Sequence, residues 1–212
     1  MRFVSSAKNL GVWLDEILDF KTQISKVASS SFMILRNIAK IKSLIPQESL
    51  CTLVCSLILS RIDYCNALYY KINSRELNVL QSVQNAAIRL VSGRHKYDCV
   101  SLSPLFLKYH WLKVRERIVF KICLTVHKCV WGDAPETLKD MMVMSNTRTK
   151  KLVEKKFQSA YGQRAFSCAG PKLWNCLPLE LRMADETDKF KTLLKSYLIT
   201  SPEKLYHQVN MR

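Results

Sequence analysis

The sequence predicts an all-α protein made of a thumb-like helical bundle and a small helical C-terminal unit, with one orphan strand at the N-terminus. Apolar residues recur every three or four positions over most of the chain, which indicates amphipathic helices. Hydrophobic residues make up 48% of the 212 positions, enough to bury a core. Residues 9–15 are instead typical of a short strand, and one strand cannot form a sheet alone. We therefore expect removal of residues 1–15 to leave stability unchanged or to raise solubility.

Three helices are expected in the first half of the chain. The first, over about residues 20–43, carries its apolar residues at helical spacing. The second, over about 46–69, is apolar nearly all round and should be central to the core. The third should be capped by Ser74 and end at Gly93. Its polar side carries Asn, Gln and Arg side chains opposite an apolar side.

The second half of the chain is expected to be less regular. A short helix begins near residue 103, and longer patterns cover about 113–131 and 134–142. Residues 143–163 lose this periodicity and collect Lys and Arg. We therefore divide the chain into a residual strand (1–15), a helical domain (16–143), a basic linker (144–163), a small helical unit (164–199) and a frayed tail (200–212).

The chain is strongly basic, with 33 Lys and Arg against 17 Asp and Glu and a net charge of +16. A charge of this sign favours nucleic acid, an anionic membrane surface or an acidic partner, although a basic protein without such a partner is an alternative. The longest apolar run, residues 50–59, is about half a membrane span, so no membrane partner is expected. No secretory signal precedes the eight cysteines, which favours an intracellular location, in the nucleus or cytoplasm.

The sequence predicts no catalytic residue, no metal site and no cofactor. Cys123, His127 and Cys129 are close in sequence, but a zinc site needs four ligands, and the nearest fourth, His110, belongs to another element. We therefore interpret these cysteines as free thiols packed in the core rather than as metal ligands. Two-metal phosphoryl transfer requires clustered acids, but no two aspartates are adjacent and none is expected at a hairpin tip between two strands. Five glycines leave little room for a phosphate-binding loop.

Basic residues line one face of the helix predicted near residue 113. Lys113, Arg117, Lys121 and Lys128 fall within about a quarter turn of one another. The opposite arc is apolar: Val114, Ile118, Ile122, Val126 and Cys129. Further candidates for contact with a phosphate backbone are Arg89, Arg36 and Lys40. The alternative is a solvated face whose Lys and Arg stems cover apolar surface, and the pattern alone does not separate the two.

Six stretches of the sequence occur in an order and at a spacing that are typical of a known family. They are LGVWLD (10–15), SRIDYCNAL (60–68), LQSVQNAAIRLV (80–91), HWLKVRERI (110–118), GQRAFS (162–167) and PKLWNCLP (171–178). Their order and spacing resemble the C-terminal region of LINE-type non-LTR retrotransposon reverse transcriptases, of the jockey-like and chicken-repeat-like kind. The sequence departs from that family at Lys113, where Pro is usual, and over residues 71–74, where a Gly-Leu-Pro turn is usual.

The resemblance implies a position within a larger RNA-directed DNA polymerase. Residues 10–15 would be the last palm strand, 20–93 the thumb, and the rest the post-thumb region; the catalytic aspartates that hold Mg²⁺ lie upstream in the family. It thus implies a non-catalytic fragment that binds RNA or DNA, duplex or single-stranded, weakly and without sequence preference. A full-length reverse transcriptase in trans is a further implied partner. The alternatives are a helical protein-interaction module and a decayed retrotransposon product without function.

Overall fold

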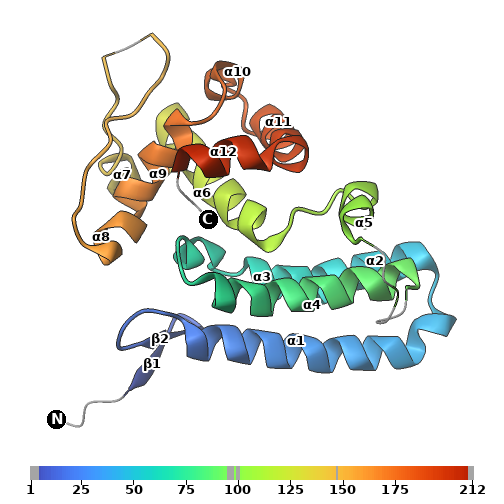
Figure 1. Ribbon diagram of the computed structural model, residues 1–212. Helices are drawn as coiled ribbons and strands as arrows, with labels where there is room; N and C mark the ends of the chain where they lie inside the picture. Colours follow the sequence, from blue (N-terminus) through green and yellow to red (C-terminus); the bar gives the residue numbers. More distant parts are fainter. Residues whose placement is uncertain (1–4, 95–97, 99–100, 147, 210–212) are drawn as a thin grey trace. The chain divides into compact units, whose positions relative to one another are not determined.

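The computed structural model describes residues 5–94, 98, 101–146 and 148–209. They form two compact units, residues 1–114 (unit 1) and 115–212 (unit 2). Most of the described residues are helical, and their strands form one two-stranded sheet (Figure 1), so the mainly helical fold class is confirmed. No helix in the described part of the chain is long and apolar enough to cross a membrane.

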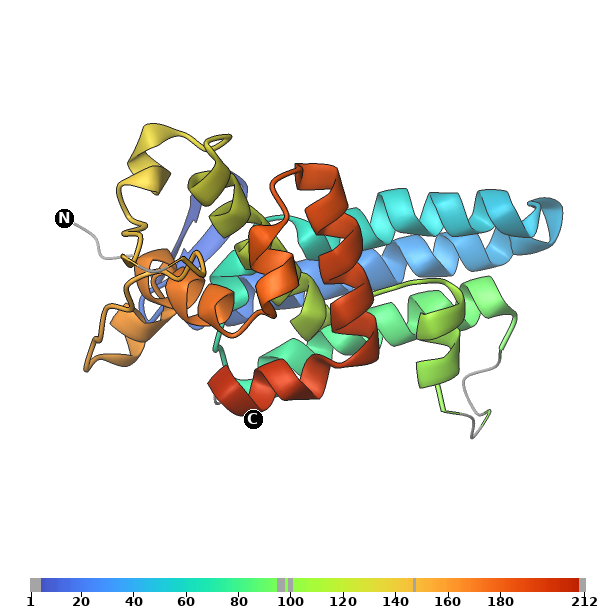
Figure 2. The same ribbon diagram turned by 90° about the horizontal axis from the view of Figure 1, so that it is seen from above.

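Unit 1 is a helical bundle in which α1 (Lys21–Ile41) and α4 (Ser74–Ser92) lie side by side (Figure 2). Between them in sequence, α2 (Gln47–Val54), the π-helical turn η2 (Cys55–Leu59) and α3 (Ser60–Asp63) follow one another without a break. The 3₁₀ turns η1 (Lys42–Leu44) and η3 (Asn66–Tyr69) and the short helix α5 (Ser103–Lys108) also belong to this unit. Its buried core includes Ile24, Val54, Leu80, Val83 and Ile88.

The helices of unit 1 follow the apolar spacing closely. α1 and α4 occupy the predicted ranges, and α4 ends as expected at Gly93, whose φ of 70° is left-handed. The predicted cap of α4 is wrong by one residue. Asn73, not Ser74, accepts the backbone N–H of Arg75 at 2.9 Å, because Asn73 is the last extended residue before the helix and Asn is as good a cap as Ser.

The N-terminal strand is not an orphan, so that part of the prediction is wrong. β2 (Val12–Asp15) pairs antiparallel with β1 (Ser6–Asn9). The two-residue turn between them consists of Leu10 and Gly11, with φ values of 45° and 84°, the left-handed pair of a tight hairpin. β1 has a polar sequence without apolar alternation, which is why its pairing could not be read from the pattern.

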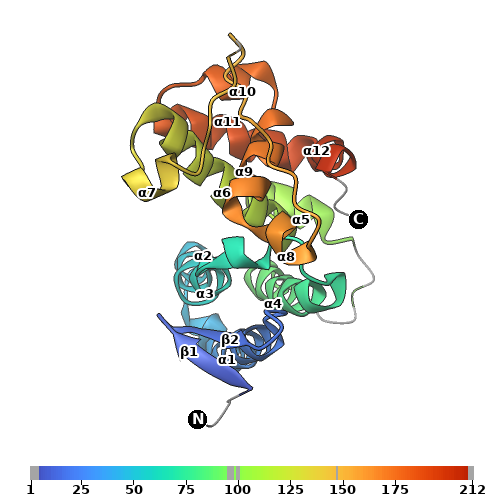
Figure 3. The same ribbon diagram turned by 90° about the vertical axis from the view of Figure 1, so that its left-hand side faces the viewer.

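The hairpin packs against α1 (Figure 3). Val12 is only 4% exposed. The backbone N–H of Trp13 donates to Oε1 of Gln23 at 3.0 Å, and the ammonium of Lys26 lies 4.5 Å from the centroid of the Trp13 ring. Because these contacts tie the hairpin to the bundle, removal of residues 1–15 should cost stability rather than leave it unchanged.

Unit 2 is built around α6 (Val114–Trp131), α9 (Phe166–Asn175) and α11 (Thr187–Thr200). Four shorter helices are described with them: α7 (Glu136–Lys139), α8 (Ala160–Arg164), α10 (Leu179–Met183) and α12 (Pro202–Val209). The core includes Ile118, Val126, Leu173, Trp174 and Phe190.

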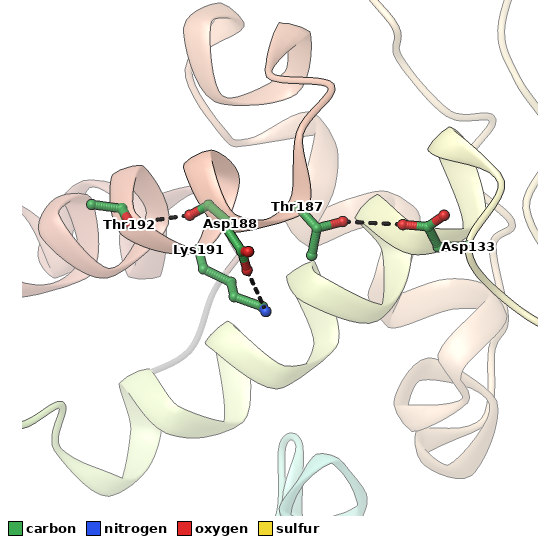
Figure 4. A network of polar contacts seen from close by, with 5 residues as sticks. All are labelled: Asp133, Thr187, Asp188, Lys191 and Thr192. Carbon is green, nitrogen blue, oxygen red and sulfur yellow. Dashed lines mark hydrogen bonds and ion pairs between the residues drawn. The ribbon is translucent and has the colours of Figure 1, made fainter.

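A polar contact joins the end of α6 to the start of α11 (Figure 4). Asp133, which follows α6, accepts a hydrogen bond from the Thr187 hydroxyl at 3.2 Å. In the first turn of α11, the Lys191 ammonium pairs with Asp188 at 2.8 Å. These contacts lie at the surface of unit 2.

The expected frayed tail, residues 200–212, is wrong for residues 202–209. They form α12, which begins with Pro202 at a favoured first helical position. Leu205 is completely buried and Tyr206 is half-buried. Burial of these two side chains stabilises the packing of the short helix against the rest of unit 2.

The expected basic linker, residues 144–163, also has structure of its own. Met144 and Leu152 form an antiparallel bridge, and α8 begins at Ala160. The segment lies within unit 2, because the two compact units meet at residues 114 and 115.

Candidate nucleic-acid interface

The helix that carries the predicted basic face is α6. It begins at Val114, so Lys113 directly precedes it and is exposed. Along the helix Lys121 is exposed, while Arg117 and Lys128 are half-buried. The predicted apolar arc is buried throughout: Val114, Ile118, Ile122, Val126 and Cys129. The helical spacing thus separates core from cations in the manner predicted.

The single acidic residue of α6 does not share this basic face. Glu116 is only 7% exposed and lies beside Tyr206 of α12. Burial, together with the negative charge of Glu116, raises the pKa of Tyr206. The outward side of α6 therefore carries positive charge that no acid of the same helix offsets.

The remaining candidates lie at one end of unit 1. Arg36 and Lys40 are exposed, one turn apart, on the last turns of α1, and half-buried Arg89 lies on the last turn of α4. α1 contains no Asp or Glu. The side-chain amide of Gln47, at the start of α2, donates to the Val91 carbonyl at 3.3 Å, which brings the chain that follows α1 to the end of α4.

A shallow pocket of about 280 Å³ lies at the same end of unit 1. Its lining comes from the turn after α1 and from the end of α4: Lys42, Ser43, Ile45, Gln47, Leu50, Leu90, Val91, Ser92 and Gly93. Gln47 also donates to the Tyr109 hydroxyl at 2.9 Å. The structure therefore gathers Lys40, Lys42 and Arg89 at one end of the bundle, an arrangement that suits an anionic group.

The polar face of α4 has a structural role that the sequence interpretation missed. Gln84 is fully buried, and its amide donates to the Leu112 carbonyl at 2.7 Å. Gln81 accepts the backbone N–H of Val114 at 3.0 Å and donates to Asn85 at 2.9 Å. These amides hold the segment that leads into α6, so their hydrogen bonds are not free for base edges.

His127 and the neighbouring cysteines belong to the core of unit 2. The His127 ring stacks on Phe190 with centroids 4.2 Å apart, and its Nε2 donates to the Ala184 carbonyl at 2.9 Å. Burial lowers the pKa of His127 and raises the pKa of Cys123. Among the residues that the structure describes, no three His, Cys, Asp or Glu side chains are placed to hold a metal ion.

No family model, curated protein or solved structure matches the chain. Within each unit, cations stand at exposed or half-buried positions on helices whose other side is buried. Such groups can bind phosphates through charge and hydrogen bonds, and they position a nucleic acid without reading its sequence.

Proposed function

We propose that this chain is a non-catalytic fragment of a LINE-type RNA-directed DNA polymerase that binds nucleic acid through its phosphate backbone. The family origin is supported by the six stretches that resemble the thumb and post-thumb region of those enzymes. Binding is supported by charge, because residues 1–114 and 115–212 each carry an excess of eight Lys and Arg over Asp and Glu.

One observation carries the proposal: α6 turns its cations outward and buries its one acid. Lys121 is exposed and Arg117 and Lys128 are half-buried, whereas Glu116 is in the core. A solvated helix without a ligand commonly mixes both signs of charge on its surface. An outward face without acids is instead suited to a polyanion.

The test is a titration of the chain with duplex and single-stranded nucleic acids of unrelated sequence at three or more salt concentrations. The logarithm of the affinity should fall linearly with the logarithm of salt, as expected for about three to five phosphate contacts. Changing Arg117→Gln and Lys121→Gln together should weaken binding equally for all sequences and reduce the slope by about two for duplex. Salt-independent binding would contradict the proposal.

A matched control removes the same charge elsewhere in unit 2. Lys189 and Lys195 are exposed residues of α11, and changing both to Gln lowers the net charge by the same two units. If net charge alone drives binding, the two double variants will behave alike. If α6 contacts the phosphates, only the α6 variant will lose slope.

The proposal also predicts that the chain does not extend a primer on an RNA template with Mg²⁺ or Mn²⁺. The reason is that two-metal catalysis requires a cluster of acidic side chains, and the sequence offers no paired aspartates that would indicate one. Incorporation that depends on the template, in a preparation free of other polymerases, would refute the non-catalytic assignment.

A second candidate function is a protein-interaction module, favoured by apolar side chains at the surface of unit 1. Met33 of α1 is 53% exposed, and Tyr64 and Leu68 near α3 are 49% and 44% exposed. A partner such as a full-length reverse transcriptase would cover such residues. Binding of that kind depends weakly on salt, so the same titrations distinguish it from binding to phosphates.

A further inference from the structure

A basic loop in unit 2 lies outside the candidate residues discussed so far. Residues 148–156, named the basic loop here, contain five Lys and Arg and a single acid. Four of the cations are exposed: Arg148, Lys151, Lys155 and Lys156. The apolar residues of the loop have no helical spacing, which is typical of a linker.

The backbone of the basic loop is nevertheless held in place by side chains of α9 and α10, of which Trp174 and Arg182 are buried and Asn175 is half-buried. The indole N–H of Trp174 donates to the Lys150 carbonyl at 2.7 Å. Asn175 makes two hydrogen bonds to the backbone of Leu152. Its side-chain amide donates to the Leu152 carbonyl at 2.8 Å, and its side-chain oxygen accepts the Leu152 N–H at 2.9 Å. Arg182, only 6% exposed, donates to the carbonyl of Thr149.

Two charged groups of the loop contact other residues of unit 2. The Lys150 ammonium lies 4.8 Å from the centroid of the Trp131 ring. The carboxylate of Glu154, the one acid of the loop, accepts the Asn175 amide at 2.9 Å. In the part of the chain that the structure describes, the four exposed cations have no ion-pair partner, so their charge is available to a ligand.

Aromatic side chains follow the basic loop directly. Phe157 is 41% exposed and Tyr161, on α8, is 54% exposed. A Cβ added to Gly162 would lie 2.7 Å from Cβ of Phe157, so the absence of a side chain at Gly162 lets Phe157 rest against the backbone of α8. The Phe157 ring is thus fixed on one side and open on the other.

We propose that the basic loop and Phe157 form a binding site for single-stranded nucleic acid. The exposed cations grip successive phosphates, and the open face of Phe157 stacks on a base. Cations beside aromatic rings are the combination that holds single strands without sequence preference. The frame of Trp174, Asn175 and Arg182 lowers the ordering cost of binding, because the loop backbone is already fixed in the free protein.

This inference rests on the proposed function but concerns a different surface and a particular form of nucleic acid. A duplex offers phosphates but no open base faces to Phe157. A membrane of anionic lipid offers phosphates as well, and the test includes it as a competing surface. The site is therefore distinguished by a preference for single strands that depends on both the cations and the ring.

The experiment titrates the full chain with an end-labelled mixed-sequence DNA 20-mer, with the corresponding duplex, and with phosphatidylserine vesicles. Changing Lys151→Gln and Lys155→Gln together should lower the salt slope for the single strand by about 1.4, or 0.7 for each phosphate. Phe157→Leu should weaken single-strand binding by about 5- to 150-fold with an unchanged slope, and should spare the duplex. The Lys189→Gln/Lys195→Gln variant is the charge-matched control.

Asn175→Ala tests the frame without changing charge. It should weaken binding of the single strand, leave the slope unchanged, and speed tryptic cleavage at Lys155 and Lys156. Thermal melting of each variant confirms that unit 2 remains folded, and Asn175→Ser provides a second variant if Asn175→Ala melts early.

The outcomes separate this inference from the proposed function. If the wild-type chain binds no nucleic acid at low salt, the proposed function fails. If it binds but the loop variants behave like the α11 control, only the inference fails. The inference would also be overturned if the loop variants lost equal affinity for duplex and single strand, or lost affinity for the vesicles alone.

Discussion

α6 and the basic loop both present cations, but they position them by different physical means. On α6 the helical repeat places Arg117, Lys121 and Lys128 opposite a buried arc, so the backbone itself determines where the charges point. In the basic loop no repeat exists, and Trp174 and Asn175 hold the backbone from 24 and 23 residues away in sequence. Helical spacing therefore allows the outward side chains of a regular element to be predicted from sequence, whereas the position of a loop that is held by distant side chains cannot be predicted in this way.

The largest expected effect comes from the buried side of α6. Ile118 is fully buried, and Ile118→Ala should destabilise the protein by about 2–5 kcal/mol, because it removes apolar contacts and leaves a cavity. Urea unfolding measures the loss, and the salt slope of binding should be unchanged in the folded variant. A change in slope without a loss of stability would mean that core and ligand faces of α6 are assigned the wrong way round.

Removal of residues 1–15 should have the next largest effect. Val12 is 4% exposed, and burial of a Val side chain contributes about 1.5–3 kcal/mol, which the deletion would forfeit. Leu10→Ala is the control, because Leu10 is 85% exposed in the turn and its loss should be neutral. If thermal melting of the shortened chain matched that of the wild type, the hairpin would contribute nothing to stability, as the sequence alone suggested.

The hairpin shows where sequence reasoning reaches its limit. The apolar spacing predicted α1, α4 and the two faces of α6, because each of those features depends on residues three or four positions apart. The pairing of β1 with β2 depends on a turn at Leu10 and Gly11, and Leu is an uncommon residue at a left-handed position, so the usual Asn-Gly signal is missing.

The candidate site was predicted in part for the same reason. Exposure of Arg36, Lys40 and Lys121 followed from helical spacing and agrees with the structure. The structural role of the Gln side chains of α4 was not predicted, because nothing local reveals that Gln84 donates to a carbonyl 28 residues away. The ordered backbone of the basic loop was not predicted, because its order comes from side chains of α9 and α10 rather than from its own residues.

A smaller effect should appear as pH falls. Burial lowers the pKa of His127, so the unfolded chain binds a proton more readily than the folded one below about pH 6.5. Stability should therefore decline as pH falls from about 6.5 toward the lower pKa of the folded state, by at most about 1.4 kcal/mol per pH unit for one group. Melting curves between pH 7.5 and 5 measure the decline.

The matched variant for the pH prediction is His127→Gln, whose amide can still donate to the Ala184 carbonyl but does not titrate. It should be less stable than the wild type at pH 7.5 and lose less stability on acidification. An equal decline in both proteins would assign the pH dependence to other groups.

The smallest effect on stability is expected at the exposed end of α1. Arg36→Gln and Lys40→Gln together should change stability by less than about 0.5 kcal/mol, because both side chains are exposed on the face opposite the core. If this end of the bundle holds duplex phosphates, the duplex salt slope should fall by about 1.8, or 0.9 for each lost contact.

Comparison of this variant with the basic-loop variant sharpens the contrast between helix and loop. The α1 change should act mainly on duplex, whereas Lys151→Gln with Lys155→Gln should act mainly on the single strand. Salt titrations of both variants with both ligands give four slopes. The proposal requires that each variant lowers the slope mainly for its own ligand. Two variants that reduce both slopes equally would mean that the chain responds to net charge alone, and that neither the regularity of α1 nor the frame around the basic loop directs the ligand.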